Sequence, residues 1–338
     1  MNDRRTFYEE MKANMVTYKT ETLDITEKGK RTTREKGTGD RIIREYDHIL
    51  PSKLWTQNLW SGISDVAVDY FSREKIKWHD QRDNLLSSQI LCVNVFFPLR
   101  NYPSLLNSFL KRFYSSLANV TDIDFEYIGP KNYFCEPGGR GYNRTSADVS
   151  IEWKDTKGKK NLLLVEFKFT ESNFGECSKS GNPDRERCNN GELVISSPQT
   201  ECYRSEVKRP YWDMVRSPQG PFQVEKLKKT KYCPFRYDFY QLMRNQLLAK
   251  CIAEDEDSGF YIAGFAVCYD DRNKNLLNLS HPIDGDSNPL TIWKSFLKDK
   301  NTFKHFTIQQ LLEYIENIDD LPSELKQWRA YLNKRYSL

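Results

Sequence analysis

The feature that most constrains the fold is an apolar segment that carries two charged residues close to its end. Residues 161–171 read NLLLVEFKFTE. Alternate residues of a strand face opposite sides, so we expect the odd-numbered positions from 163 to 169 to face a core, while Glu166 and Lys168 share the other face. Charged side chains are costly to bury unless they are paired or bind a ligand. The segment therefore predicts a buried strand that carries a functional pair of residues.

A second strand precedes this one and supplies another carboxylate. Residues 147–153 read ADVSIEW and alternate in polarity, with Asp148 close to the start. A turn containing Gly158 joins the two segments, which favours an antiparallel hairpin. Asp148 and Glu166 are 18 residues apart, which leaves room for two strands and the turn. We expect Asp148 and Glu166 to converge across the hairpin, with Lys168 beside them.

Two carboxylates and a lysine are suited to metal-assisted hydrolysis of phosphodiesters. Oxygen ligands favour Mg²⁺, or the similar Mn²⁺, which keeps several waters and also binds phosphate oxygens. We expect Asp148 and Glu166 to bind the metal, together with the backbone carbonyl of Phe167. Lys168 could orient or deprotonate the attacking water, or stabilise the developing charge. The alternative is a structural cluster of ion pairs at the end of a sheet.

The order of elements around this hairpin predicts an α/β core. Residues 85–96 follow a helical period that ends before Pro98, and Pro103 can begin another helix. A strand is expected at 124–129, a helix at 237–254, a strand at 259–270, and helices near 305–317 and 323–335. This order favours one mixed sheet flanked by helices. Aromatic residues make up 13 % of the 338 residues, enough to form a core of this size.

Three regions are expected along the chain. Residues 1–120 would form an N-terminal arm and a helical region, residues 121–275 the catalytic core, and residues 276–338 a C-terminal helical extension. The basic stretch Lys28 to Arg41 is interpreted as a hairpin tip or mobile arm, either a solvated loop or an arm that binds the DNA backbone. Residues 172–233 are interpreted as a long irregular insertion, which is uncommon unless it is functional or held by a metal.

These residues resemble the PD-(D/E)XK, or restriction-endonuclease-like, nuclease superfamily. The resemblance rests on Asp148, on Glu166-Phe167-Lys168, and on the order of elements over about residues 79–270. A bacterial branch of restriction endonucleases shows a pattern like the one at residues 87–99 here. Its matching positions are Ser87, Ser88, Gln89, Asn94, Phe96, Pro98 and Leu99. Ala147 replaces the proline of the superfamily's motif. The resemblance implies a restriction-endonuclease-like fold and a Mg²⁺-dependent DNA endonuclease acting in restriction or defence.

Many nucleases of this superfamily use a further acidic or polar residue. Glu126 and Glu136 are candidates for the acid, although either could be an ordinary surface residue. Gln241 and Gln246 lie on the helix that follows the core strands, and either could line the same site or a solvated helix face.

The eight cysteines divide into core thiols and a group in the insertion. Cys92, Cys251 and Cys268 lie in apolar patterns and are expected to be core thiols. Four others lie in or beside residues 172–233 and could bind zinc or an iron–sulfur cluster, or remain unligated. These are Cys177, Cys188, Cys202 and Cys233, and Cys135 could replace one of them. Some nucleases of this superfamily hold such a cluster, with different cysteine spacing.

Basic residues mixed with aromatic residues indicate contact with DNA. The net charge is only +4, but the segments 207–216 and 225–237 combine lysine and arginine with tyrosine, tryptophan and phenylalanine. A glycine-rich GGRGYNR precedes Asp148 and could let the backbone approach a phosphate. The candidate DNA contacts are Arg140, Arg144, Lys208, Arg209, Lys228 and Lys229.

We expect a cytoplasmic protein that does not contact membranes, because the sequence shows neither a signal peptide nor a membrane-spanning segment. A homodimer is plausible, because cutting both strands of a palindrome calls for two active sites. Two alternatives stay open. One is an exonuclease or repair nuclease stabilised by zinc or an iron–sulfur cluster, and the other is a non-cleaving DNA-binding protein with the same fold.

Overall fold

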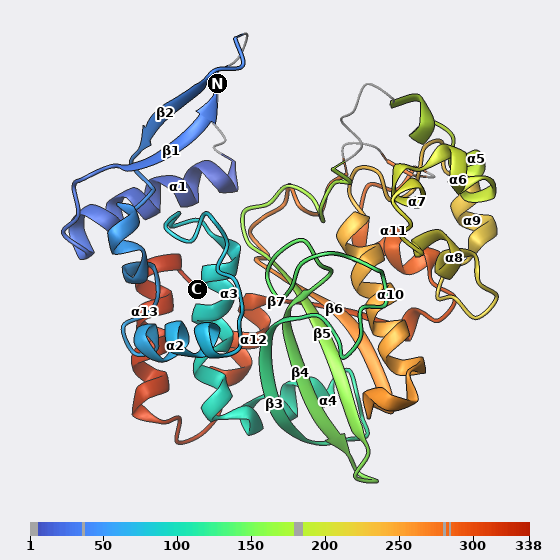
Figure 1. Cartoon of the computed structure of the whole chain (residues 1–338). Helices are drawn as coiled ribbons and strands as arrows, with labels where there is room; N and C mark the ends of the chain where they lie inside the picture. The colour runs from blue at the N-terminus through green and yellow to red at the C-terminus, as the bar shows by residue number, and fades with distance from the viewer. Residues whose placement is uncertain (1–5, 36–37, 179–184, 280–281, 284) are drawn as a thin grey trace.

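The core of the protein is a five-stranded mixed sheet with the strand order β3-β4-β5-β6-β7 (Figure 1). The computed structural model describes residues 6–35, 38–178, 185–279, 282–283 and 285–338. Strands β3, β4 and β5 pair antiparallel, whereas β5, β6 and β7 run parallel. The strands are β3 (Leu117–Tyr127), β4 (Ala147–Asp155), β5 (Lys160–Lys168), β6 (Ile262–Tyr269) and β7 (Phe303–Thr307).

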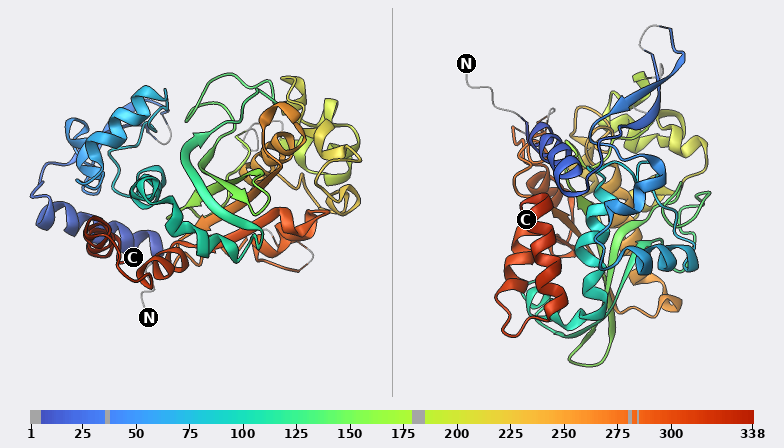
Figure 2. Two further views of the ribbon diagram at one scale, coloured as in Figure 1. Left: turned by 90° about the horizontal axis from the view of Figure 1, so that it is seen from below. Right: turned by 90° about the vertical axis from the view of Figure 1, so that its left-hand side faces the viewer.

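Helices cover both faces of the sheet, as Figures 1 and 2 show from three sides. Each face has its own hydrophobic cluster, because apolar side chains alternate along the strands. The first face is covered by α1 (Phe7–Thr17), α2 (Ser64–Arg73), α3 (Ser88–Phe96), α4 (Asn107–Lys111), α12 (Ile308–Glu316) and α13 (Ser323–Tyr336). The second face is covered by α10 (Tyr240–Glu254), α11 (Pro289–Phe296) and the short helices that precede them.

Strand β5 has the alternation that its sequence predicts. Leu163, Val165 and Phe167 join the first hydrophobic cluster, together with Phe169 just beyond the strand. Leu162 and Leu164 join the second cluster, on the opposite face. The predicted α/β class with a mixed sheet flanked by helices is therefore confirmed.

Four parts of the chain differ from the sequence prediction. The charged N-terminal region contains helix α1, which Thr6 and Glu9 begin with a reciprocal capping box. Residues 303–307, predicted to be partly helical, form edge strand β7, and α11 was not predicted. Residues 172–233, predicted to be irregular, contain short helices, with 179–184 outside the described residues. These helices are α5 (Gly191–Ser196), α6 (Pro198–Glu201), α7 (Tyr203–Glu206), α8 (Tyr211–Arg216) and α9 (Val224–Lys228).

The ends of the chain meet around helix α3. Asn94 of α3 is fully buried and accepts a hydrogen bond from the backbone N–H of Trp60 at 2.8 Å. The backbone carbonyl of Asn94 accepts a hydrogen bond from the indole N–H of Trp328, on α13, at 2.7 Å. The first hydrophobic cluster contains residues of all three regions expected from the sequence, from Phe7 to Leu338. The boundaries assigned to those regions remain a prediction.

A separate two-stranded ribbon projects from the N-terminal part of the molecule (Figures 1 and 2). Its strands are β1 (Gly29–Arg34) and β2 (Arg41–Tyr46), paired antiparallel. The basic stretch interpreted as a hairpin tip or mobile arm thus lies largely within a regular hairpin, of which residues 36–37 are outside the described part.

Candidate active site

Pairing between β4 and β5 brings Asp148 next to Glu166. Val149 is opposite Val165 in this antiparallel pair. Asp148, which precedes Val149, is therefore opposite Glu166, which follows Val165. The backbone N–H of Phe167 donates a hydrogen bond to Asp148 Oδ2 at 2.6 Å. The convergence expected from the hairpin spacing is present in the structure.

Lys168 and Glu166 form a buried ion pair at the end of β5. Lys168 Nζ lies 2.8 Å from Glu166 Oε1, and the two residues are only 4 % and 3 % exposed. Two residues of helix α10 form hydrogen bonds with this ion pair. Gln241 Oε1 accepts from Lys168 Nζ at 2.7 Å, and Asn245 Nδ2 donates to Glu166 Oε2 at 2.6 Å.

A third carboxylate, that of Glu126, approaches from β3. Phe125 is opposite Val149 and Tyr127 is opposite Ala147, so Glu126 lies at the level of Asp148. The backbone of Glu126 has φ of +47°, a strained left-handed conformation for a residue with a side chain. This geometry accompanies the turning of a buried acid toward the other two carboxylates.

Glu126 is held by residues from three other segments. Gln89 of α3 donates from Nε2 to Glu126 Oε1 at 2.7 Å, and Ser146 donates from Oγ to Oε2 at 2.8 Å. His79 Nε2 lies 3.4 Å from Oε1. Burial lowers the pKa of His79, but the hydrogen bond and charge of Glu126 outweigh burial, so the net pKa is raised.

Because three carboxylates lie close together, a negative charge on any one of them is costly. Burial, followed by the charges of Glu166 and Glu126, raises the pKa of Asp148 well above its ordinary value. Burial lowers the pKa of Lys168, but the charges of Glu166, Glu171 and Asp148 more than compensate and raise it overall. Lys168 is therefore a fixed cation at neutral pH, and the cluster favours an additional positive charge.

The carboxylates face a pocket of about 160 Å³. It is lined by Glu126, Asp148 and Glu166, by Gln241 and Asn245 of α10, and by the glycine-rich segment before β4. A larger pocket of about 880 Å³ adjoins it and shares His79, Gly141, Tyr142 and Asn143. Within the described ranges, no three His, Cys, Asp or Glu side chains are placed as a ready-made metal site.

The match to a known protein family extends over almost the whole chain. A family model described as "Restriction Endonuclease associating with ARP" matches residues 11–337. The chain belongs to this family. The resemblance to restriction endonucleases predicted from the sequence is therefore confirmed. No match was found among curated proteins or among solved structures.

The pattern at residues 87–99 has a structural role around helix α3. Ser87 caps α3 by accepting a bond from the N–H of Ile90 at 3.4 Å. Gln89 holds Glu126, and Asn94 joins α3 to distant segments. The pattern thus positions the carboxylate cluster, and it was the signal that could have placed Gln89 at the site.

Of the other acidic or polar residues predicted for the site, only one lines the carboxylate pocket. Glu136 is buried outside the carboxylate pocket, where it accepts from the N–H of Thr145 at 2.6 Å and lies 3.3 Å from Arg244 Nη2. Gln241 lines the pocket. Gln246 does not, because it is buried and donates to Thr302 Oγ1 at 3.3 Å. The prediction did not include His79, Ser146 or Asn245, although Gln241 and Asn245 have the i, i+4 spacing of a helix face.

Three of the candidate DNA contacts form hydrogen bonds or ion pairs with other residues of the chain. Arg144 lines the carboxylate pocket and donates to the carbonyl of Lys131 at 2.6 Å. Arg140 forms an ion pair with Asp124 at 2.5 Å, and Lys228 forms one with Glu225 at 2.7 Å. The other three lie, like Lys228, in the α7–α9 segment, and none of them lines the carboxylate pocket; they are Lys208, Arg209 and Lys229.

The four cysteines of residues 172–233 line one pocket of about 30 Å³. They are Cys177, Cys188, Cys202 and Cys233, all free thiols. The thiols of Cys188 and Cys233 share a hydrogen bond, which lowers the pKa of Cys188 to about 7 and raises that of Cys233. Cys135 is exposed and does not line this pocket. Cys92 and Cys268 are buried, and Cys251 is partly buried.

No helix within the described residues is both long enough and apolar enough to span a bilayer.

Proposed function

We propose that this chain is a divalent-metal-dependent DNA endonuclease of the restriction or defence type. The observation that supports this most directly is the meeting of Asp148, Glu166 and Lys168 at adjacent strand ends, in a member of a restriction endonuclease family. The proposal includes the restriction-endonuclease-like core, with β3 to β6 and helices α3 and α10 around the site. Its substrate is double-stranded DNA.

The donor set fits a hard cation such as Mg²⁺ or Mn²⁺. Buried carboxylate oxygens are preferred ligands of these ions, and the raised pKa of Asp148 indicates unbalanced negative charge at the site. Asp148 and Glu166 would hold the ion. Glu126, which lines the same pocket, and the Phe167 carbonyl are further candidate ligands. When bound, the ion would lower the pKa of a ligating water and neutralise charge on the scissile phosphate.

Lys168 acts as a cation in this proposal. Its raised pKa keeps the ammonium group charged at neutral pH, which disfavours a role as general base. Gln241 and Glu166 hold the ammonium group in place from two sides. Lys168 can therefore position the attacking water and stabilise the negative charge that develops on the phosphate. The raised pKa thus favours two of the three roles that the sequence left open.

The test compares Lys168→Ala with the wild type on supercoiled plasmid and phage DNA, with Mg²⁺, with Mn²⁺ and with EDTA. We expect metal-dependent cleavage by the wild type and a loss of about 100-fold or more in Lys168→Ala, because a preorganised charge is removed. Lys160→Ala is the matched control, since Lys160 begins the same strand, is exposed and lies at the opposite end.

Three outcomes would contradict the proposal. Equal cleavage by Lys168→Ala and wild type would show that Lys168 is not part of the catalytic site. No metal-dependent cleavage of any DNA would favour the non-cleaving alternative. Cleavage of linear DNA without cleavage of closed circles would favour the exonuclease alternative.

A second cofactor, zinc or an iron–sulfur cluster, is proposed for the cysteine pocket. The support is that four of the eight cysteines, widely spaced in sequence, line one small pocket. The thiols would have to turn from their present hydrogen bonds to share an ion. We expect the protein purified without oxygen to carry zinc or iron in a fixed ratio to the chain, and Cys202→Ser/Cys233→Ser to lose it.

Elemental analysis and an absorption spectrum test this second cofactor. Absorption near 400 nm would indicate iron–sulfur, and a colourless protein with zinc would indicate a structural zinc site. Cys92→Ser is the control, because Cys92 is buried in the other hydrophobic cluster. Absence of both metals, with all eight thiols free to react after unfolding, would contradict the proposal.

A homodimer also remains a prediction.

A further inference from the structure

The β1–β2 ribbon is a regular structure with little of the chain packed against its outer part. It forms a sheet of its own, and no strand of the five-stranded sheet pairs with it. Figures 1 and 2 show the ribbon extending beyond the helices. An isolated two-stranded ribbon has marginal stability in water, so its order must come from its base or from a partner.

The base of the ribbon is fixed to the body by specific contacts. Arg31 donates from Nη1 to Asp83 Oδ2 at 2.9 Å. The N–H of Gly29 donates to the carbonyl of Ile49 at 3.0 Å, and a side chain at Gly29 would clash with Ile49. Lys19 donates to the carbonyls of Asp47 and Ile49, both at 3.0 Å. The ribbon is thus held rigidly at one end.

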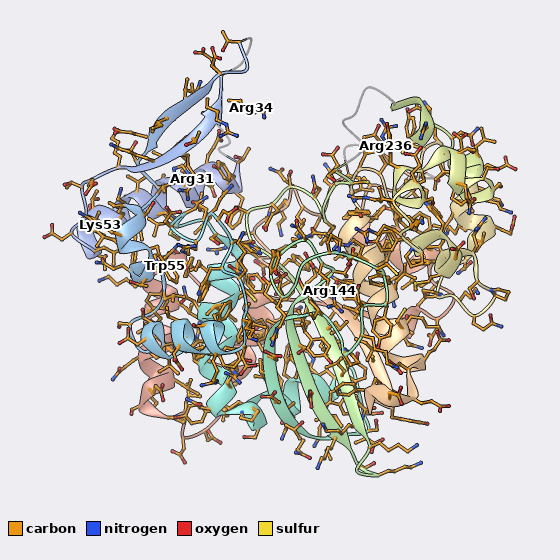
Figure 3. All side chains as sticks on the ribbon, viewed as in Figure 1. Arg31, Arg34, Lys53, Trp55, Arg144 and Arg236 are labelled. Carbon is orange, nitrogen blue, oxygen red and sulfur yellow. The ribbon has the colours of Figure 1, made fainter. Side chains whose placement is uncertain are left out.

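The ribbon places arginines directly opposite one another at two positions. Arg34 is paired with Arg41 across the ladder, and Arg31 with Arg44. Like charges at such positions destabilise a ladder. Arg34, Arg41 and Arg44 are exposed, and no carboxylate of the described residues forms an ion pair with them. Figure 3 shows Arg34 on the outer ribbon and Arg31 nearer its base.

One face of the ribbon combines two of these cations with small apolar groups. Thr32 is opposite Ile43, and this pair lies on the same face as Arg34 and Arg41 because side chains alternate along each strand. Ile43 is 70 % exposed. Arginine hydrogen-bonds phosphates and guanine edges, and apolar groups contact the methyl of thymine in the major groove.

The ribbon base adjoins the pocket system of the carboxylates. Asp83, which anchors Arg31, is followed by Asn84, and Asn84 lines the pocket of about 880 Å³. That pocket shares His79 and Tyr142 with the smaller pocket that contains Asp148. We call these two adjoining pockets the recess; its lining includes both the carboxylates and Asn84, which follows Asp83 at the foot of the ribbon.

We propose that the β1–β2 ribbon binds in the major groove of duplex DNA and holds the duplex along this recess, over the carboxylates. The inference rests on the proposed function, which supplies the substrate. The major groove of B-DNA admits a two-stranded ribbon, and the unpaired arginines supply the positive charge that its phosphates attract. The cost of opposed arginines in the free protein is then relieved by the bound polyanion.

The test measures DNA binding without cleavage, by fluorescence anisotropy of a labelled duplex of about 30 base pairs in EDTA. The variant is Arg34→Ala/Arg41→Ala/Arg44→Ala. We expect its affinity to fall about tenfold or more, and the slope of log K against log salt to decrease by about 2 to 3, because each phosphate contact contributes about 0.9. The control removes the same number of positive charges from exposed lysines of α4 and of the β4–β5 hairpin, with Lys111→Ala/Lys154→Ala/Lys157→Ala. It should bind within about twofold of the wild type.

The outcomes separate this inference from the proposed function. If the wild type binds and cuts DNA and the arginine variant binds equally well, the ribbon assignment is wrong and the nuclease proposal stands. An equal loss of affinity for duplex and for a single strand of the same length would overturn the major-groove assignment. A wild type that neither binds nor cuts DNA would contradict the proposed function itself. Circular dichroism and thermal unfolding should show that the arginine variant is folded.

Discussion

At the scale of single residues, the buried carboxyl group of Asp148 lowers the stability of the fold when it is ionised. Its carboxyl group is buried beside Glu166 and Glu126, and the only hydrogen bond to it that the described residues supply comes from the N–H of Phe167. The raised pKa means that stability is lost as pH rises from the ordinary value of 3.8 toward the raised value. At neutral pH without metal, Asp148 therefore weakens the fold.

Asp148→Asn should reverse that cost while it removes activity. The amide oxygen can still accept from the N–H of Phe167, but it carries no charge. We expect DNA cleavage to fall to background, and the free energy of unfolding in EDTA to rise by about 1 kcal/mol at pH 8. This advantage should shrink as pH is lowered toward 3.8, because the folded wild type then keeps the proton on Asp148 and avoids the buried negative charge.

Urea denaturation at pH 5 and pH 8 measures this difference. Asp148→Ala is the matched comparison, since it also removes the charge but leaves the buried N–H of Phe167 without its acceptor, and it should be less stable than the Asn variant. A stability difference that does not change with pH would contradict the explanation based on the carboxyl group.

At the scale of elements, helix α3 connects the site to both ends of the chain. Gln89 faces Glu126, and about one and a half turns later Asn94 bonds the backbone of Trp60 and the carbonyl of Asn58. Asn94 Nδ2 also lies 3.0 Å from the Tyr331 hydroxyl of α13. The helix therefore positions one carboxylate through contacts that hold distant segments together.

Asn94→Leu should destabilise the protein strongly. The substitution leaves the N–H of Trp60 and the carbonyl of Asn58 without the bonds that Asn94 makes in a buried position. We expect the free energy of unfolding to fall by about 2 to 4 kcal/mol. Ser88→Ala, on the same helix and only partly buried, is the control and should cost less than about 1 kcal/mol. Chemical denaturation of both variants checks this, and equal midpoints would contradict it.

At the scale of the whole molecule, the C-terminal helix belongs to the main core. Leu325, Trp328, Leu332 and Tyr336 of α13 are fully buried in the first hydrophobic cluster. Arg335 donates to the carbonyl of Asn58 at 2.7 Å, which is far away in sequence. The cluster is shared by N-terminal, central and C-terminal elements, so none of these is expected to fold well alone.

Removal of residues 322–338 should therefore prevent folding. The truncation exposes the apolar surfaces of α1 and α3 that α13 covers and removes two of the largest buried side chains, Trp328 and Tyr336. We expect the truncated chain to be insoluble or to lack a cooperative unfolding transition, because loss of a buried aromatic alone costs about 3 to 5 kcal/mol. A soluble truncated chain with a cooperative transition would contradict this.

The sequence alone determined the features that depend on local geometry. Strand alternation fixed which side chains of β5 face the core, and a short turn fixed the approach of Asp148 to Glu166, because both follow from the two-residue period of a hairpin. The motif of two carboxylates and a lysine is therefore recognisable in the amino-acid sequence itself. Helix α10 was also predictable, because its apolar residues recur with a helical period.

Tertiary structure alone decided which distant residues complete the site. Gln89, His79 and Asn245 reach the carboxylates from separate elements, and β7 becomes a strand by pairing with the edge of β6. The widely spaced cysteines line one pocket, and the ribbon base adjoins the recess that leads to Asp148. Such contacts depend on how packed layers bring remote segments together, and local periodicity carries no information about that arrangement.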